Sequence, residues 1–246
     1  MKQLRCIYEE GAHRWYAIVR DPARPEHLID TNEYVVAHGN ELMLCDPGGI
    51  EIFPAVFSAL STACDPSQLR AIFASHQDPD IISSLALWLE FNPSLHCYTS
   101  WLWSSFLPHF GGTAATFVSI PDEGLTIELD GLELVAIPAH YLHASGCFHL
   151  YDARARILFS GDVGAALLPP GADTLFVEDF ESHIRFAENF HRRWMGSERA
   201  KQQWCDRVSA MEIDMLCPQH GAIYRGEDVA RFIDWFRRLE IGCAQN

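Results

Sequence analysis

Basic residues are scarce in this 246-residue sequence. It contains 18 Lys and Arg residues against 33 Asp and Glu residues, which gives a formal net charge of −15 at neutral pH. Nucleic acids and anionic membrane surfaces bind proteins mainly through clustered positive charge. The composition therefore argues against both as partners.

Targeting signals and paired cysteines are also missing. Residues 1–8 lack the apolar run of a signal peptide, and no stretch approaches the roughly 18 uninterrupted apolar residues of a membrane span. The eight cysteines are scattered without a C-x-x-C pair, and most lie in apolar runs, where free cysteine behaves as a small hydrophobic residue. We therefore expect a cytoplasmic protein that does not enter a membrane.

The order of apolar segments predicts an α/β protein. The first part alternates strands with helices, and the second begins with a series of strands and ends mainly in helices. The predicted strands are residues 34–37, 41–45, 70–75, 96–98, 116–119, 125–129, 132–137, 147–151, 156–160 and 214–217. The predicted helices are residues 51–64, 82–90, 101–110, 182–194, 197–210 and 227–239. Without repeats or a long linker, residues 1–246 are expected to form a single domain.

One turn has the composition of a metal site. The segment His76-Gln77-Asp78-Pro79-Asp80-Ile81 follows a short apolar strand and precedes a predicted helix. Its His and two Asp residues alternate, so three metal-ligand side chains lie within a few residues. An ordinary turn is the competing interpretation, in which Asp80 caps the helix.

Three later loops strengthen the metal interpretation. His143, Asp162 and His220 each follow an apolar strand, and each lies in a loop that contains glycine. Such positions at strand ends are where α/β folds collect functional side chains. Four loops of this kind together predict a metal site better than four unrelated turns.

At this point the chain resembles the metallo-β-lactamase superfamily, and within it the di-iron domain of flavodiiron proteins. The family motif H-x-E-x-D-H corresponds to residues 76–81, and the later ligands correspond to His143, Asp162 and His220. The resemblance implies a four-layer αββα fold. It also implies that one metal is held by His76, Asp78 and His143, that the other is held by Asp80 and His220, and that Asp162 bridges them.

Two positions depart from the family pattern. Asp78 stands where the family has Glu, and zinc hydrolases of the superfamily have His there. A set of three carboxylates and three imidazoles favours iron or manganese over zinc. Ile81 replaces the second His, so the second metal is expected to keep an open position for a small ligand. The alternative is that the second site stays empty.

The resemblance implies a function in oxygen binding. Flavodiiron reductases continue into an FMN-binding flavodoxin domain, and no such segment follows here, so no FMN is expected on this chain. The stand-alone relatives are oxygen-binding di-iron proteins, which implies two iron ions, with zinc or manganese as possible substitutes. We expect reversible binding of O2 as a peroxo adduct, in an oxygen sensor or carrier for signalling such as chemotaxis.

Two other functions stay open. One is a reductase of O2, NO or peroxide that uses a separate electron-donor protein, and the other is a metal-dependent hydrolase, against which Asp78 argues. The expected partners are O2 and a chemotaxis-type signalling protein or an electron donor, and relatives commonly form head-to-tail homodimers. His140 is expected to have a structural role, whereas Tyr224, four residues after His220, could approach the metals.

Overall fold

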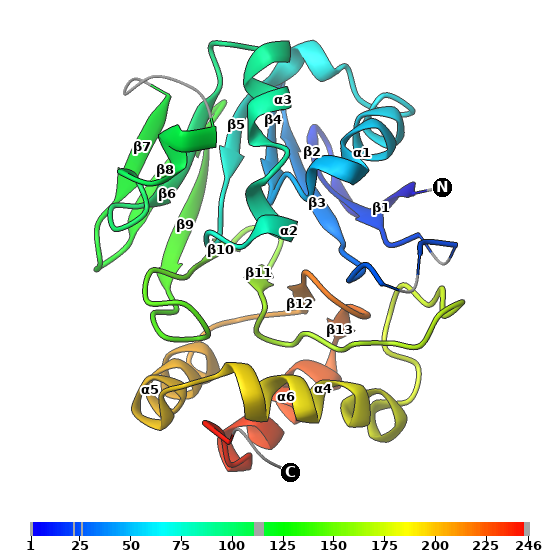
Figure 1. Cartoon of the computed structure of the whole chain (residues 1–246), viewed down its shortest axis with the longest axis vertical. Helices are drawn as coiled ribbons and strands as arrows, with labels where there is room; N and C mark the ends of the chain where they lie inside the picture. Colours follow the sequence, from blue (N-terminus) through cyan, green and yellow to red (C-terminus); the bar gives the residue numbers. More distant parts are fainter. Residues whose placement is uncertain (1, 22, 26, 111–115, 244–246) are drawn as a thin grey trace.

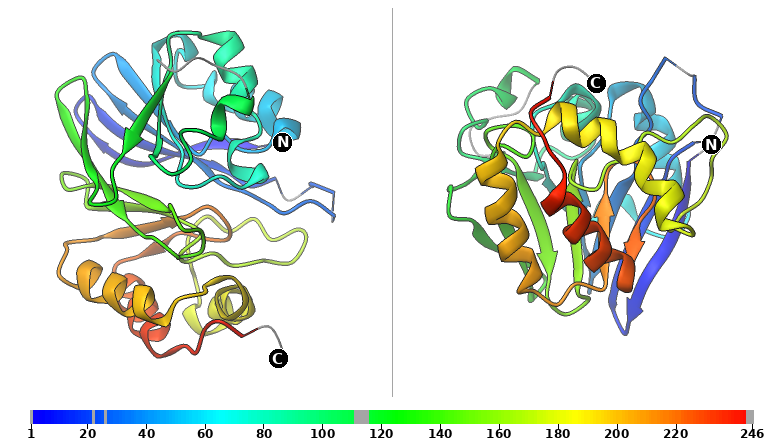
Figure 2. Two further views of the ribbon diagram at one scale, coloured as in Figure 1. Left: turned by 60° about the vertical axis from the view of Figure 1, so that its left-hand side comes forward. Right: turned by 90° about the horizontal axis from the view of Figure 1, so that it is seen from below.

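Two β-sheets packed face to face form the centre of the molecule, and helices cover the outer face of each sheet (Figure 1). The computed structural model describes residues 2–21, 23–25, 27–110 and 116–243. In the side view of Figure 2 the order of the layers is helix, sheet, sheet, helix. This arrangement confirms the expected four-layer αββα fold.

The first sheet combines an antiparallel half with a parallel half. Its strands, in spatial order, are β1 (Gln3–Glu10), β2 (His13–Val19), β3 (Glu33–His38), β4 (Glu41–Cys45), β5 (Leu69–Phe73), β6 (His96–Ser100) and β7 (Phe117–Ile120). Neighbouring strands are antiparallel from β1 to β4 and parallel from β4 to β7. Its helices are α1 (Phe53–Leu60), α2 (Pro79–Ile82) and α3 (Leu85–Phe91), with 3-10 turns at Ile50–Ile52, Pro66–Gln68 and Leu107–Phe110.

The second sheet is antiparallel except at one pair. Its spatial order is β13 (Tyr224–Arg225), β12 (Met215–Pro218), β11 (Ile157–Gly161), β10 (Phe148–Asp152), β9 (Leu132–Pro138) and β8 (Leu125–Leu129). Strands β11 and β12 run parallel, because helices α4 (Phe180–Trp194) and α5 (Glu198–Ser209) connect them. Helix α6 (Glu227–Arg238) completes the outer layer.

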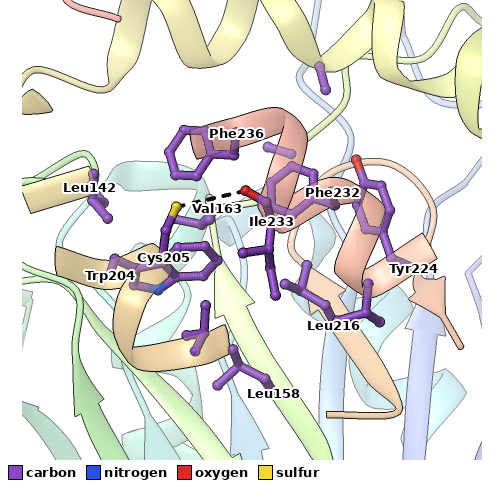
Figure 3. Close-up of a cluster of buried hydrophobic side chains, with 14 of the residues drawn as sticks. Leu142, Leu158, Val163, Trp204, Cys205, Leu216, Tyr224, Phe232, Ile233 and Phe236 are labelled. Atoms are coloured by element: carbon purple, nitrogen blue, oxygen red, sulfur yellow. Dashed lines mark hydrogen bonds between the residues drawn. The ribbon is translucent and has the colours of Figure 1, made fainter. Parts of the chain in front are cut away.

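Alternation along the central strands divides the apolar side chains among three cores. In β3, Tyr34 and Val36 pack between the sheets, whereas Val35 packs towards α1 and α3. In β11, Phe159 packs between the sheets, whereas Leu158 faces the helices α4, α5 and α6 that cover the second sheet (Figure 3). Strands buried on both faces need uninterrupted apolar runs, which explains why these strands were recognisable in the sequence.

Several predicted boundaries were wrong. No α-helix forms over residues 101–110; turns lead instead into a 3-10 helix, and Pro108 lacks the N–H that a regular helix would need there. The predicted helix over 82–90 is replaced by α2 and α3, which are separated at Ser83 and Ser84.

Strands β1 and β2 were not anticipated. Strand β1 lies at the edge of the sheet and is largely exposed, so it carries charged residues instead of an apolar alternation. Strand β13 was also missed, because its two residues are too short to show a pattern. Within the described residues, no helix is both long and apolar enough to cross a bilayer.

Replacing Phe159 by Ala should destabilise the protein strongly. The ring is fully buried and contacts Tyr34 and Phe73 of the opposite sheet, with centroid distances of 5.5 and 6.2 Å. We expect the free energy of unfolding in urea to fall by about 3–5 kcal/mol. The control is Phe186→Ala on α4, whose side chain is 41% exposed, and it should change stability by less than about 1 kcal/mol. Equal losses in the two variants would contradict this account of the inter-sheet core.

Candidate metal centre

The four predicted loops meet at one end of the sandwich. They follow strands β5, β9, β11 and β12, and backbone hydrogen bonds join them. Phe148 N–H donates to the carbonyl of Ser75 (3.0 Å), which ties the two sheets together beside His76. Gln219 N–H donates to the carbonyl of Gly161 (2.8 Å), which brings His220 next to Asp162.

Three side chains form one group of possible ligands. Potential ligand atoms of His76, Asp78 and His143 all lie within 4.8 Å of one another. His143 Nε2 lies 3.3 Å from Asp78 Oδ2, and His76 Nε2 lies 3.9 Å from the same oxygen. The group has two imidazole nitrogens and a carboxylate oxygen directed at a common point.

Asp80 and His220 form a second group, and Asp162 lies between the two. His220 Nε2 is 3.5 Å from Asp80 Oδ2. Asp162 Oδ2 lies 3.5 Å from His76 Nε2 and 2.8 Å from His143 Nε2, whereas Oδ1 lies 3.3 Å from His220 Nε2. The two oxygens of one carboxylate therefore face different groups.

The histidine rings are oriented by hydrogen bonds at their other nitrogen. His220 Nδ1 donates to the carbonyl of Asp30 (2.6 Å). His76 Nδ1 lies 2.9 Å from Ser75 Oγ, and that hydroxyl donates to Asp46 Oδ2 (2.6 Å). Both arrangements leave Nε2 without a proton in the neutral ring, which is the form that binds a metal.

Polar atoms at the centre lack hydrogen-bond partners. Within the described part of the chain, His76 Nε2, His143 Nε2 and Asp162 Oδ1 are buried and make no hydrogen bond of normal geometry. Unpaired buried polar atoms are rare and costly in native proteins. Their convergence on the two groups fits a site built to hold cations.

The family model for ODP family β-lactamases matches residues 29–221. The chain belongs to the ODP family. A search among curated proteins found no match.

Solved structures agree with this assignment. A structure described as "Peroxy diiron species of chemotaxis sensor ODP" shares 38% identity with a TM-score of 0.88, over 98% of this chain and 96% of that chain. The apo state of the chemotaxis sensor ODP from T. denticola gives the same values. A flavo di-iron protein from Thermotoga maritima shares the fold at 21% identity and a TM-score of 0.81, over 96% of this chain and 61% of that chain.

All six predicted ligand residues of this ODP family member come together. The structure gives other partners to the two additional candidates: His140 Nε2 donates to the carbonyl of Asp122 (2.9 Å), and the Tyr224 hydroxyl donates to the carbonyl of Gly164 (3.1 Å). Ile81 is fully buried and packs in the core beneath α1 and α3. Its side chain supplies no ligand atom.

Sequence reasoning missed the residues around the centre. Asp46 follows strand β4 and precedes Pro-Gly-Gly, the same kind of strand-end signal that identified the ligands, and that signal could have found it. Phe190 and Trp194 of α4 were missed for a different reason, because helical spacing alone does not show what a helix covers. The Trp194 ring contacts His143 edge-on at a centroid distance of 5.3 Å, and Phe190 lies 6.1 Å from His220.

Charges at the centre are strongly coupled. Burial lowers the pKa of His143, but the Asp162 and Asp78 carboxylates outweigh it and raise the pKa to about 10. Burial also lowers the pKa of His220, but the carboxylates of Asp162 and Asp80 outweigh it and raise the pKa to about 9. Burial raises the pKa of Asp162, yet the three imidazoles hold it well below its usual range. Asp46 has no such cluster of cations, and burial raises its pKa to about 7.

These shifts predict unusual titration in the metal-free protein. His143 and His220 should stay protonated at neutral pH and lose their protons near pH 10 and 9. Because both folded-state pKa values are raised, the stability they contribute is complete below pH 6.5 and is lost as the pH rises through these values. Side-chain NMR of the histidine rings would measure this. His149 is the internal control, because burial and then Arg207 lower its pKa to about 3; normal titration of His143 near pH 6.5 would contradict the prediction.

Proposed function

We propose that this ODP family member binds O2 reversibly at a di-iron centre and reports its presence to a signalling protein. The observation that carries the proposal is the placement of Asp162, whose two oxygens face two separate groups of ligand atoms. In this proposal His76, Asp78 and His143 hold one iron, Asp80 and His220 hold the other, and Asp162 bridges them.

The donor set supports iron. Three carboxylates and three imidazoles make a harder and more anionic site than the histidine-rich sites that select zinc. When bound, a pair of ferrous ions supplies two electrons for the reversible binding of O2. The chain's own part is to hold the imidazoles in the correct tautomer through Ser75 and the Asp30 carbonyl.

The shape of the site supports a small exogenous ligand. Asp78 and Asp80 have side chains that are 26% exposed, whereas Asp162 and His76 are almost completely buried. Solvent therefore reaches the centre on the side of these two Asp residues. Ile81 offers no ligand atom beside Asp80, so we propose that the second iron keeps a position for O2.

The relatives support the signalling part. The relative with 38% identity is described as a chemotaxis sensor with a peroxy diiron species. We therefore propose a chemotaxis-type signalling partner for this chain. We further propose that the protein is cytoplasmic and that residues 1–246 form one domain. We also propose a head-to-tail homodimer, and light scattering would show whether the mass in solution is that of a dimer.

Anaerobic loading with ferrous iron tests the proposal. We expect two irons per chain and a visible absorption band that appears on adding O2 and disappears when O2 is removed. Steady consumption of O2 with oxidation of an added donor protein would show a reductase instead. Preferential binding of zinc with turnover of an ester or lactone would overturn the proposal.

Substitution of the bridging residue should abolish the paired site. In Asp162→Ala both groups lose a carboxylate oxygen, so we expect iron affinity to fall by more than the roughly ten- to hundredfold loss typical of residues beyond the ligands. Iron analysis after dialysis would measure this. His140→Ala is the control, because His140 bonds to the Asp122 carbonyl and lies outside both groups. Equal iron content in the two variants would contradict the assignment.

A further inference from the structure

The turn that carries Asp162 is held from outside by two buried side chains. This turn, residues 160–164, begins at the end of β11 and has its own hydrogen bonds, from Val163 N–H to the Ser160 carbonyl (3.0 Å) and from Ser160 Oγ to the Val163 carbonyl (2.6 Å). These bonds shape the turn. The N–H of Gln219, which donates to the Gly161 carbonyl, joins the start of the turn to the His220 loop, and the contacts of Gly164 hold its other end.

His191 of α4 accepts the N–H of Gly164. Its Nδ1 donates to the carbonyl of Ala187 (2.8 Å), one helical turn earlier, so Nε2 carries the lone pair that accepts from Gly164 (3.0 Å). The ring is fully buried, and burial lowers its pKa to about 4, so the neutral acceptor form persists at neutral pH. Rings on either side of His191 along α4, Phe190 and Trp194, contact His220 and His143.

Tyr224 of β13 binds the other side of the same residue. Its hydroxyl donates to the carbonyl of Gly164 (3.1 Å), and its buried ring packs against Phe232 at a centroid distance of 4.8 Å (Figure 3). Gly164 has a φ of +99°, and a Cβ there would lie 2.7 Å from Leu216 Cδ2. A residue with a side chain therefore does not fit at this position.

We propose that His191 and Tyr224 are positioning residues that clamp Gly164 and thereby set the place of the Asp162 carboxylate between the two groups of ligands. The inference rests on the proposed function for the role of Asp162, but the clamp itself is a property of the metal-free chain. Removing either contact leaves a buried backbone group without its partner, and the turn relaxes to satisfy it. The carboxylate two residues earlier then moves away from the point at which both oxygens reach a ligand group.

A pair of substitutions at His191 separates the acceptor from the bulk of the ring. Leu in His191→Leu fills much of the space but accepts no hydrogen bond, whereas Gln in His191→Gln keeps an acceptor on a side chain of similar reach. In the metal-free protein we expect hydrogen exchange of the Gly164 amide to be at least about tenfold faster in His191→Leu, with recovery in His191→Gln. In the iron-loaded protein we expect a roughly ten- to hundredfold loss of iron affinity and weaker magnetic coupling between the irons in His191→Leu.

Tyr224→Phe provides an independent variant that removes a single oxygen and keeps the ring. It should lower the magnetic coupling, and the unpaired Gly164 carbonyl should lower the thermal midpoint by only a few degrees. The control variant lies away from Gly164. Tyr151→Phe removes a hydroxyl that donates to the Glu212 carbonyl. It should alter neither Gly164 exchange nor the coupling.

The outcomes distinguish the two proposals. If the wild-type protein binds no iron pair, the proposed function fails, and Gly164 exchange still decides whether the clamp exists. If the wild-type protein binds the pair and His191→Leu and Tyr224→Phe keep its exchange rates, affinity and coupling, the positioning inference is wrong. Equal effects of His191→Leu and His191→Gln would also overturn it, because a ring needed for bulk alone is not a hydrogen-bond clamp.

Discussion

A single buried carboxylate organises this protein. Asp162 lies among the imidazoles of His76, His143 and His220, and their attraction holds its pKa well below the usual range in spite of burial. Burying this many ionisable groups is costly unless opposite charges or metal ions compensate them. The loops around Asp162 therefore have to be placed accurately, and much of the surrounding structure serves that placement.

Both sheets contribute charged side chains to the centre. The first sheet supplies His76 and Asp78 from the loop after β5 and Asp80 from the first turn of α2, and the second sheet supplies His143, Asp162 and His220. Because the two sheets also bury Phe159 and its neighbours between them, the inter-sheet core holds together the members of each ligand group, which come from both sheets. Helix α4 also contacts the centre. Its Trp194 and Phe190 rings pack against His143 and His220, respectively. Its His191 accepts a hydrogen bond from the turn that carries Asp162.

Hydrogen bonds around the centre connect distant parts of the chain. Asp46 acts on His76 through Ser75, and the carbonyl of Asp30 orients His220. These partners matter for the chemistry because they select the tautomer that leaves Nε2 available. Asp78 and Ile81 give this chain a shorter first carboxylate and one imidazole fewer than the flavodiiron motif.

The sequence by itself determined the apolar central strands, the αββα resemblance and the six candidate ligands, because each ligand lies directly after a strand or in a short motif. These signals depend only on residues close together in the chain, so they can be recognised in the sequence alone. The tertiary structure decided how far apart the ligand atoms of the six residues lie, which group each oxygen of Asp162 faces, and the contacts of Asp46, His191 and Tyr224. These depend on strand register and on contacts such as the one between Gly164 and His191, which are 27 residues apart in the chain. Spacing in sequence does not encode such contacts, because the packing of sheets and helices chooses which distant groups meet.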